Sequence, residues 1–303
     1  MKILLLGSNG QVGWELQRSL APLGQLEMHD KQTADLSDLT QLRILIQQVQ
    51  PDVIVNAAAY TAVDQAEAEV AAAHQINAAA VKVMAEEAKK ANVCLLHYST
   101  DYVFDGSKSS FYNESDEPNP LSVYGQSKLA GEQAIINSHC HHFILRTSWV
   151  YAARGSNFAK TMLRLAQERD ELKVVADQIG APTSAELIAD ITALLVFQIK
   201  NNQGFVQKNT GIYNLVAAGE ASWFDFARYV IERAKALGMD FKVGPENIVP
   251  IKTEEFPRPA KRPMNSKMAT TKLAGLLNIE FPLWTYHVNR MVTEYVEQNQ
   301  DAA

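Results

Sequence analysis

Short apolar runs alternate with segments of helical spacing through the first half of the chain. The runs have the length and the β-branched or aromatic character of strands buried in a parallel sheet. They lie at residues 2–7, 26–30, 52–58, 94–100 and 143–148. Apolar residues recur every three or four positions between them, which predicts helices at residues 12–24, 39–49, 66–91 and 124–137. This alternation predicts an α/β fold with a doubly wound parallel sheet, a Rossmann fold.

The regular alternation ends near Ser148. Gly and Pro in residues 149–158 and 176–184 predict loops there. Further patterned segments predict a strand at 211–217 and helices at 184–199, 223–238 and 284–298.

The pattern divides the chain into two expected lobes. A dinucleotide-binding domain comprises residues 1–148 with 184–218. A second, smaller, mostly helical substrate lobe comprises residues 149–183 with 219–303. We expect it to pack over the carboxyl edge of the sheet, where ligands of such folds bind.

Composition narrows the class of protein and of ligand. With 303 residues, 47% of them hydrophobic and 20% charged, the chain is long enough for a large core. Acidic residues outnumber basic ones, 34 to 28, which argues against nucleic-acid binding and favours a small ligand. The apolar run at the N-terminus is broken by Gly7 and is too short for a signal peptide, so we expect a cytoplasmic protein. Only two cysteines are present, and they imply no disulfide framework.

A glycine-rich turn follows the first predicted strand and precedes a helix. Glycines at this spacing let the backbone approach a pyrophosphate, whose charge is met by free N–H groups at the start of the helix. The turn therefore predicts a dinucleotide site; a plain tight turn is the alternative. Its candidate cofactor-binding residues are Gly7, Asn9, Gly10, Gln11, Val12 and Gly13.

The ends of the next two strands supply further candidates for the cofactor site. Asp30 ends the second strand, where a carboxylate accepts hydrogen bonds from the adenosine ribose, which favours NAD(H). Lys31 follows it and would neutralise a 2′-phosphate, so NADP(H) stays open. We expect Asp35 and Leu36 to flank the adenine. After the third strand, small side chains and backbone would lie beside the ribose and phosphates; for the alanines a purely core role is an equal alternative. These residues are Ala58, Ala59, Tyr60 and Thr61.

The candidate catalytic residues come from the fourth strand and the helix after it. Thr100 and Asp101 lie at the carboxyl end of that strand, and Tyr124 and Lys128 lie one helical turn apart. A Tyr–Lys pair alone is a weak signal, but beside a nicotinamide it suits ketone reduction. Tyrosine would protonate the alkoxide, and the lysine ammonium would lower the tyrosine pKa and hold the ribose.

Two neighbouring residues have more limited roles in this scheme. Thr100 would hydrogen-bond the carbonyl oxygen as charge develops on it. Asn77 would complete a water-linked proton path, or would simply lie on the surface.

The strings GSNGQVG, STDYVF and YGQSK resemble motifs of the extended short-chain dehydrogenase/reductase family, in its order and spacing. Within that family the chain resembles the dTDP-4-dehydrorhamnose reductases over essentially its full length. The more specific strings include HYSTDYVFDG, VYGQSKLAGE, RTSWVYA and DQIGAPTSAELIAD.

The resemblance implies NAD(P)H-dependent reduction of the 4-keto group of dTDP-4-dehydro-β-L-rhamnose. The product, dTDP-L-rhamnose, would serve cell-surface polysaccharide such as the lipopolysaccharide O-antigen. The resemblance makes Thr100, Tyr124 and Lys128 catalytic and places Asp101 and Trp149 against the sugar nucleotide. A buried core residue is the alternative for Trp149. Arg262 would pair with the diphosphate, or be an ordinary surface arginine.

The resemblance also implies a homodimer bridged by Mg²⁺. Glu15, Glu186 and Glu294 occupy the matching motifs, with ordinary surface glutamates as the alternative. One departure from the family pattern is Tyr60, where relatives commonly have histidine.

Two other functions stay open. One is a nucleotide-sugar epimerase or dehydratase, which would retain and recycle its cofactor. The other is a non-catalytic, reductase-like regulatory subunit, against which the intact Thr100, Tyr124 and Lys128 argue.

Overall fold

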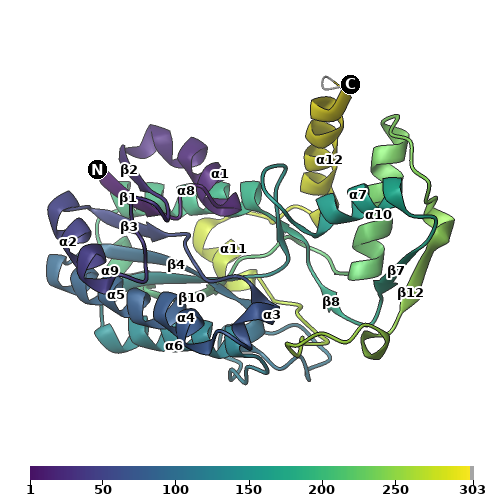
Figure 1. Cartoon of the computed structure of the whole chain (residues 1–303). Coiled ribbons are helices and arrows are strands. Elements are labelled where there is room, and N and C mark those ends of the chain that lie inside the picture. Colours follow the sequence, from purple (N-terminus) through teal and green to yellow (C-terminus); the bar gives the residue numbers. More distant parts are fainter. Residues whose placement is uncertain (301–303) are drawn as a thin grey trace.

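The computed structural model describes residues 1–300, except for the side chains of Pro245, Asn299 and Gln300. A six-stranded sheet in the order β10-β5-β4-β3-β1-β2 forms the centre, and every pair of neighbouring strands is parallel (Figure 1). The strands are β1 (Lys2–Leu6), β2 (Gln25–His29), β3 (Val53–Asn56), β4 (Cys94–Thr100), β5 (His141–Thr147) and β10 (Gly211–Asn214). The predicted doubly wound parallel sheet is confirmed.

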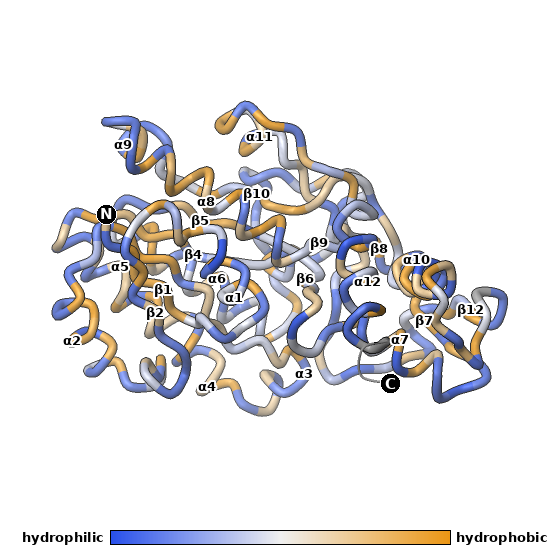
Figure 2. The backbone as a smooth tube through the Cα atoms, turned by 90° about the horizontal axis from the view of Figure 1, so that it is seen from above, coloured by the Kyte–Doolittle hydropathy of each residue, from blue (hydrophilic) through white to orange (hydrophobic). Residues whose placement is uncertain are grey.

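Helices cover both faces of this sheet, which explains why β1, β3, β4 and β5 are buried along nearly their whole length. On one face α1 (Gln11–Leu20) packs against α8 (Ala185–Asn201). On the other face lie α2 (Leu39–Val49), α5 (Ala80–Ala91) and α6 (Val123–Ser138). Figure 2 shows hydrophobic segments along the central strands and hydrophilic segments in the outer turns.

The segment predicted as one helix, residues 66–91, is divided in the structure. It contains the end of α3 (Val63–Ala66), then α4 (Val70–His74), a π-helical turn (Gln75–Ala79) and α5. Alanine favours helix throughout this stretch, so local propensity does not reveal the break. The π-helical turn lies beside α6 and carries Asn77 toward the loop that follows β3.

The second lobe combines helices with short strands. In it α7 (Phe158–Glu168) and α10 (Trp223–Ala236) pack against a parallel pair, β7 (Leu172–Val175) and β12 (Ile248–Ile251). Helix α12 (Trp284–Gln300) packs against α7 and α10. The sequence patterns did not predict α7, β7 or β12. Three short strands, β6 (Val150–Tyr151), β8 (Ile179–Gly180) and β9 (Thr183–Ser184), lie in segments predicted as loops and take part in two strand pairs. Strand β6 pairs with β9, and β8 pairs with β11 (Ala221–Ser222).

The remaining short helices lie mainly at the edges of the two lobes. They are α9 (Phe205–Asn209), α11 (Thr271–Leu277) and the 3₁₀ turns Ala21–Leu23, Asp101–Val103, Pro245–Asn247 and Thr253–Glu255. Leu273 of α11 belongs to the apolar core of the sheet, so part of the C-terminal segment packs on the first lobe. The exact lobe boundaries stay a prediction. Within residues 1–300, no helix has the length and apolar character needed to cross a membrane.

Candidate active site

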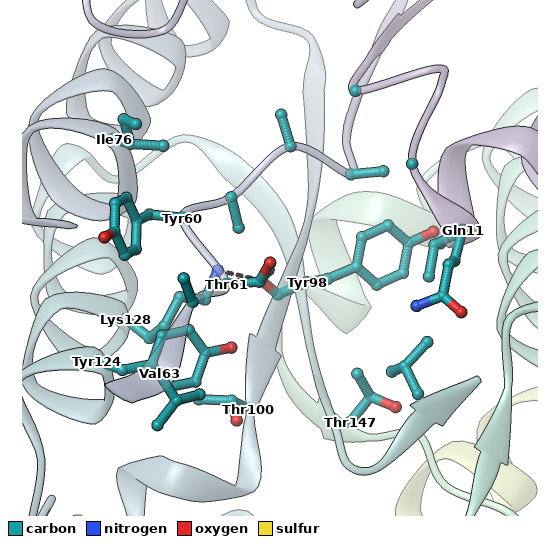
Figure 3. Close-up of a pocket in the computed structure, with 18 of the residues that line it drawn as sticks. Gln11, Tyr60, Thr61, Val63, Ile76, Tyr98, Thr100, Tyr124, Lys128 and Thr147 are labelled. Atoms are coloured by element: carbon teal, nitrogen blue, oxygen red, sulfur yellow. Dashed lines mark hydrogen bonds between the residues drawn. The ribbon is translucent and has the colours of Figure 1, made fainter. Parts of the chain in front are cut away.

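A cavity of about 940 Å³ opens at the carboxyl ends of the sheet strands. The glycine turn and the ends of β2 and β3 line one part of it, and β4, α6 and the second lobe line the rest. Figure 3 shows Tyr124, Lys128 and Thr100 on one side, with Gln11, Tyr98 and Thr147 across from them. The predicted residues that line this cavity are Gly7, Asn9, Gly10, Gln11, Val12, Asp30, Asp35, Leu36, Ala58, Ala59, Tyr60, Thr61, Thr100, Asp101, Tyr124, Lys128 and Trp149.

The glycine turn is shaped by close backbone contacts. Gly7 has φ of +80°, and a Cβ there would lie 2.6 Å from the Ala58 nitrogen. A Cβ at Gly13 would lie 2.0 Å from the Gly7 carbonyl oxygen, so Gly13 permits the turn without lining the cavity. Helix α1 begins at Gln11, and its N-cap, Gly10, provides no side-chain cap. The first N–H groups of α1 are therefore suited to an anion in the cavity.

The Asp30 carboxylate organises the turn after β2. Its Oδ1 accepts hydrogen bonds from the backbone of Gln32 and Thr33, at 3.0 and 3.1 Å. Its Oδ2 accepts one from Asn9 Nδ2 at 2.5 Å, which ties the glycine turn to β2. Hydrogen bonds from Thr33 lower the Asp30 pKa, so the half-buried carboxylate is charged at neutral pH. Lys31 also lines the cavity. The cavity therefore contains both the carboxylate that favours NAD(H) and the ammonium that would favour NADP(H).

Asn77 is 1% exposed, and its amide fixes the loop after β3. Asn77 Oδ1 accepts from the Tyr60 nitrogen at 2.9 Å, and Nδ2 donates to the Tyr60 carbonyl oxygen at 3.0 Å. Nδ2 also lies 3.0 Å from Ser127 Oγ on α6. The surface alternative for Asn77 is therefore wrong, and the residue holds the cofactor-side loop against the helix that carries Tyr124. Its part in a proton path stays a prediction.

Tyr124 and Lys128 face the cavity from α6. Ser122 caps that helix by accepting from the Gly125 nitrogen at 3.2 Å, which fixes where Tyr124 enters. Burial raises the Tyr124 pKa to about 12, and a hydrogen bond with Thr100 acts in the opposite direction. The prediction that the Lys128 ammonium lowers this pKa is wrong for this structure, because burial outweighs the effects that lower it.

Lys128 is 2% exposed and lies against β4. Its Nζ donates to the Tyr98 carbonyl oxygen at 2.6 Å and lies 3.3 Å from His97 Nε2. Burial lowers the Lys128 pKa to about 8.

Thr100 and Asp101 form a hydrogen-bonded pair at the end of β4. Thr100 Oγ1 donates to Asp101 Oδ1 at 3.0 Å. Asp101 is 2% exposed, and burial raises its pKa to about 6. The site thus holds a buried carboxyl group with a raised pKa beside the tyrosine.

An aromatic wall closes the cavity on the side of the second lobe. Trp149, with φ of +47°, stacks on Trp223 with ring centroids 3.7 Å apart. Trp149 and Trp223 both line the cavity. Trp149 also packs against the apolar core of the second lobe, so it lies both at the predicted binding surface and in the core. Sequence analysis missed Trp223 and Tyr102, whose ring meets Tyr124 edge to face at 5.5 Å. The only local signal for Trp223 is its place after Ser222, the capping residue of α10.

Arg262 is not among the residues that line the cavity. Its guanidinium forms two hydrogen bonds with the Asp64 carboxylate, at 3.0 and 2.9 Å, and that pairing lowers the Asp64 pKa. In this structure Arg262 thus forms an ion pair with Asp64 between the two lobes, and its role at the diphosphate stays a prediction.

The three glutamates predicted to hold a metal lie on α1, α8 and α12. Burial raises the Glu15 pKa, and the charges of Glu186 and Glu294 act in the same direction. Glu15 pairs with Arg18 at 3.5 Å, and Glu186 with Arg290 at 2.7 Å. Among residues 1–300 no group of three or more His, Cys, Asp or Glu side chains could hold a metal ion. The three residues therefore do not fit a metal site within one chain.

The motifs and this geometry agree with comparisons to known proteins. The family model described as the RmlD substrate binding domain matches residues 1–297. The chain belongs to this family. The resemblance seen in the sequence is thereby confirmed.

Members of the family resemble the chain from end to end. The dTDP-4-dehydrorhamnose reductase of Escherichia coli K12 is 46% identical over 97% of this chain and 98% of its own. That of Salmonella typhimurium LT2 is 47% identical with the same coverage. The crystal structure of dTDP-4-dehydrorhamnose reductase from Bacillus anthracis in complex with NADP matches with a TM-score of 0.87 at 36% identity, covering 97% of this chain and 99% of that one.

Proposed function

We propose that this RmlD-family chain reduces the 4-keto group of dTDP-4-dehydro-β-L-rhamnose with NAD(P)H. The product is dTDP-L-rhamnose, destined for cell-surface polysaccharide such as the O-antigen. The observation that carries the proposal is one cavity that joins a glycine turn at the start of a helix to Tyr124, Lys128 and Thr100. The names of the relatives support the choice of sugar nucleotide.

The residues of the glycine turn fit a dinucleotide, because the free N–H groups at the start of α1 face the cavity. When bound, a reduced nicotinamide supplies the hydride. Tyr124 donates its phenolic proton to the oxygen that was the ketone, and Thr100 hydrogen-bonds that oxygen as charge develops. In its ammonium form, Lys128 holds the nicotinamide ribose and stabilises the phenolate that Tyr124 leaves behind.

The second lobe supplies the binding surface for the sugar nucleotide. The paired indoles of Trp149 and Trp223 offer a flat apolar wall for the deoxysugar or the thymine. Asp101, beside Thr100, accepts hydrogen bonds from the substrate when it is ionised. Arg262 remains the residue predicted to pair with the diphosphate, for which it would exchange its bonds with Asp64.

A spectrophotometric assay tests the reduction. NADPH or NADH absorbance at 340 nm is followed with dTDP-4-dehydrorhamnose as substrate. One mole of reduced cofactor consumed per mole of sugar nucleotide supports the proposal. Conversion of the sugar without net consumption would favour the epimerase or dehydratase alternative. Cofactor binding without any conversion would favour the regulatory subunit.

The homodimer, the Mg²⁺ ion and the cytoplasmic location remain predictions. We propose that a bridging metal would require a second copy of the chain, because the glutamates form no three-ligand group in one chain. Sedimentation velocity with EDTA and with Mg²⁺ tests this. A dimer that forms only with Mg²⁺, and is lost in Glu186→Gln, supports the prediction; an unchanged monomer in both buffers would refute it.

A further inference from the structure

A row of buried polar groups connects Lys128 to the loop beside the cofactor cavity. His97 Nε2 lies 3.3 Å from Lys128 Nζ, and His97 Nδ1 lies 3.0 Å from Asn56 Nδ2. Asn56 Oδ1 in turn accepts a hydrogen bond from the Ala58 nitrogen at 3.1 Å. Asn56, His97 and Lys128 are each 1–2% exposed, so solvent does not replace these partners. Ala58 lines the cavity itself.

The Ala58 nitrogen fixes the direction of every hydrogen bond in this row. A backbone N–H only donates, so the Asn56 atom facing it is the carbonyl oxygen. The Asn56 NH₂ group therefore faces His97 and donates to Nδ1. A neutral imidazole that accepts at Nδ1 carries its proton on Nε2. The N–H of His97 thus points at Lys128.

This direction matters because an ammonium has no lone pair. Lys128 as an ammonium would place its own N–H groups against the His97 N–H, and two donors do not form a hydrogen bond. As a neutral amine, Lys128 accepts from His97 Nε2 and still donates to the Tyr98 carbonyl oxygen, 2.6 Å away. The geometry therefore satisfies the amine more completely than the ammonium.

We propose that His97, oriented by Asn56, is a positioning residue that favours the amine of Lys128 over its ammonium. The proposal deepens the proposed function, in which the ammonium is the working form. According to this proposal, the fraction of Lys128 present as ammonium depends on the tautomer of His97, which does not line the cavity.

None of the other groups described around Lys128 donates a hydrogen bond that would favour its amine form. Glu132, one turn further along α6, is the charged group that favours the ammonium. Its carboxylate is engaged by Arg146, with hydrogen bonds of 2.9 and 2.6 Å. Tyr124 on α6 is neutral, because its pKa is raised to about 12. On β4 the Tyr98 carbonyl oxygen accepts from either form of the lysine. Burial and the neighbouring lysine hold the His97 pKa well below its usual value, which keeps the ring neutral.

The first test reads the tautomer directly in the cofactor-free protein. Two-bond ¹H–¹⁵N NMR spectra distinguish a ring protonated at Nε2 from one protonated at Nδ1. The His97 signals are assigned by their loss in His97→Gln. We expect the Nε2–H tautomer throughout pH 6–9. An Nδ1–H tautomer or a charged ring would overturn the proposal.

The second test reverses the donor and acceptor roles along the row of hydrogen bonds by a substitution at Asn56. Asn56→Asp keeps an acceptor for Ala58 but replaces the NH₂ donor by an oxygen, so His97 must carry its proton on Nδ1 and accept from Lys128. The ¹³Cε shift of Lys128 is titrated in lysine-labelled protein. We expect the midpoint to rise by about one pH unit or more. The double variant Asn56→Asp/His97→Leu keeps the new charge but removes the ring.

The double variant separates the row of hydrogen bonds from the bare charge. Cancellation of most of the rise in the double variant supports the proposal, and an equal rise with and without the ring contradicts it. If Asn56→Asp does not fold, His97→Gln takes its place, because its amide can present oxygen to the ammonium and should also raise the midpoint. His142→Gln is the matched control: His142 is another buried histidine, on β5, whose Nδ1 bonds the Cys140 carbonyl oxygen. It should leave Lys128 unchanged.

A pH profile provides the functional readout. In the wild type we expect kcat/KM to fall above pH 8, as Lys128 loses its proton. In His97→Gln the alkaline limb should move to higher pH, whereas a merely structural defect would lower the whole profile without moving it. The NMR titrations involve no turnover, so they decide the role of His97 even if the proposed reduction fails.

Discussion

The indole of Trp149 lies face to face with that of Trp223, with 13° between the ring planes. Gly180 makes this arrangement possible, because a Cβ there would lie 2.8 Å from Trp149 Cε2. Gly180→Ala must therefore displace the ring. We expect the KM for the sugar nucleotide to rise several-fold, and the free energy of unfolding to fall by about 1–3 kcal/mol from the crowding. Steady-state kinetics and urea denaturation measure the two effects.

Gly275→Ala is the matched control for this substitution. Gly275 lies in α11 with a negative φ, and nothing approaches within 4 Å of the added Cβ. It should leave the KM unchanged and stabilise the helix slightly. An unchanged KM in Gly180→Ala as well would remove the indole pair from substrate binding.

Tyr124→Phe removes the proposed proton donor and keeps the aromatic ring that Tyr102 contacts. We expect turnover to fall about a hundredfold or more, as is typical for loss of a general acid, with the Kd for NADPH little changed. Tyr102→Phe, which also loses one hydroxyl from a half-buried ring, should retain most of the turnover. Near-normal turnover in Tyr124→Phe would mean that the proton comes from another group.

The parallel sheet and the glycine turn are predictable from the sequence because both leave local signals. Strands buried on two faces are mostly apolar, and the glycines at the first turn are required because a Cβ at Gly7 or Gly13 would lie less than 3 Å from backbone atoms. Helix α7 also carries a signal, since its buried residues Ala159, Leu163 and Ala166 recur at helical spacing. The Gly and Pro in the segments on either side favour loops and hide this helical spacing.

Long-range pairings leave no such trace. Arg262 meets Asp64 across 198 positions of sequence, and nothing in the residues beside either one indicates this pairing. Asn77 looks like any polar residue in an alanine-rich helix until the fold brings the Tyr60 backbone against it. The predicted lowering of the Tyr124 pKa is wrong for a related reason. Spacing along α6 indicates a neighbouring lysine, but the position of its Nζ against the Tyr98 carbonyl oxygen depends on tertiary packing.

Asp30→Ala tests the choice of nicotinamide cofactor. The substitution removes the carboxylate that would bind the adenosine ribose and leaves Lys31 beside the cavity. We expect the KM for NADH to rise more than that for NADPH, so the ratio of kcat/KM values shifts toward NADPH. Asp38→Ala is a suitable control. Asp38 also accepts two backbone hydrogen bonds, as the N-cap of α2, but does not line the cavity. An unchanged ratio in Asp30→Ala would place cofactor selection elsewhere.

Asp101→Asn should stabilise the protein in a pH-dependent way. The native pKa of about 6 is higher than the ordinary value of 3.8, so the folded chain binds a proton more tightly than the unfolded chain. Ionised Asp101 therefore destabilises the fold increasingly as pH rises from 3.8 to 6, by about 3 kcal/mol once both states are ionised. The amide carries no charge to bury. We expect the gain in free energy of unfolding to be large at pH 7.5 and small at pH 4.5, with turnover reduced at both.

Asp105→Asn, in the same region of the chain, should change the free energy of unfolding in the opposite direction. Hydrogen bonds from Ser107, Asn119 and Tyr112 hold the Asp105 pKa well below its usual value, so its charged form stabilises the fold. That variant should lose stability at pH 7.5. Urea denaturation of both variants at the two pH values measures the contrast. An increase in the free energy of unfolding of Asp101→Asn that is equal at pH 4.5 and 7.5 would show that the carboxyl group is not protonated preferentially in the folded state. Asp101 lies beside Thr100. An increase confined to high pH would therefore mean that the charge kept next to the reacting oxygen lowers the stability of the fold.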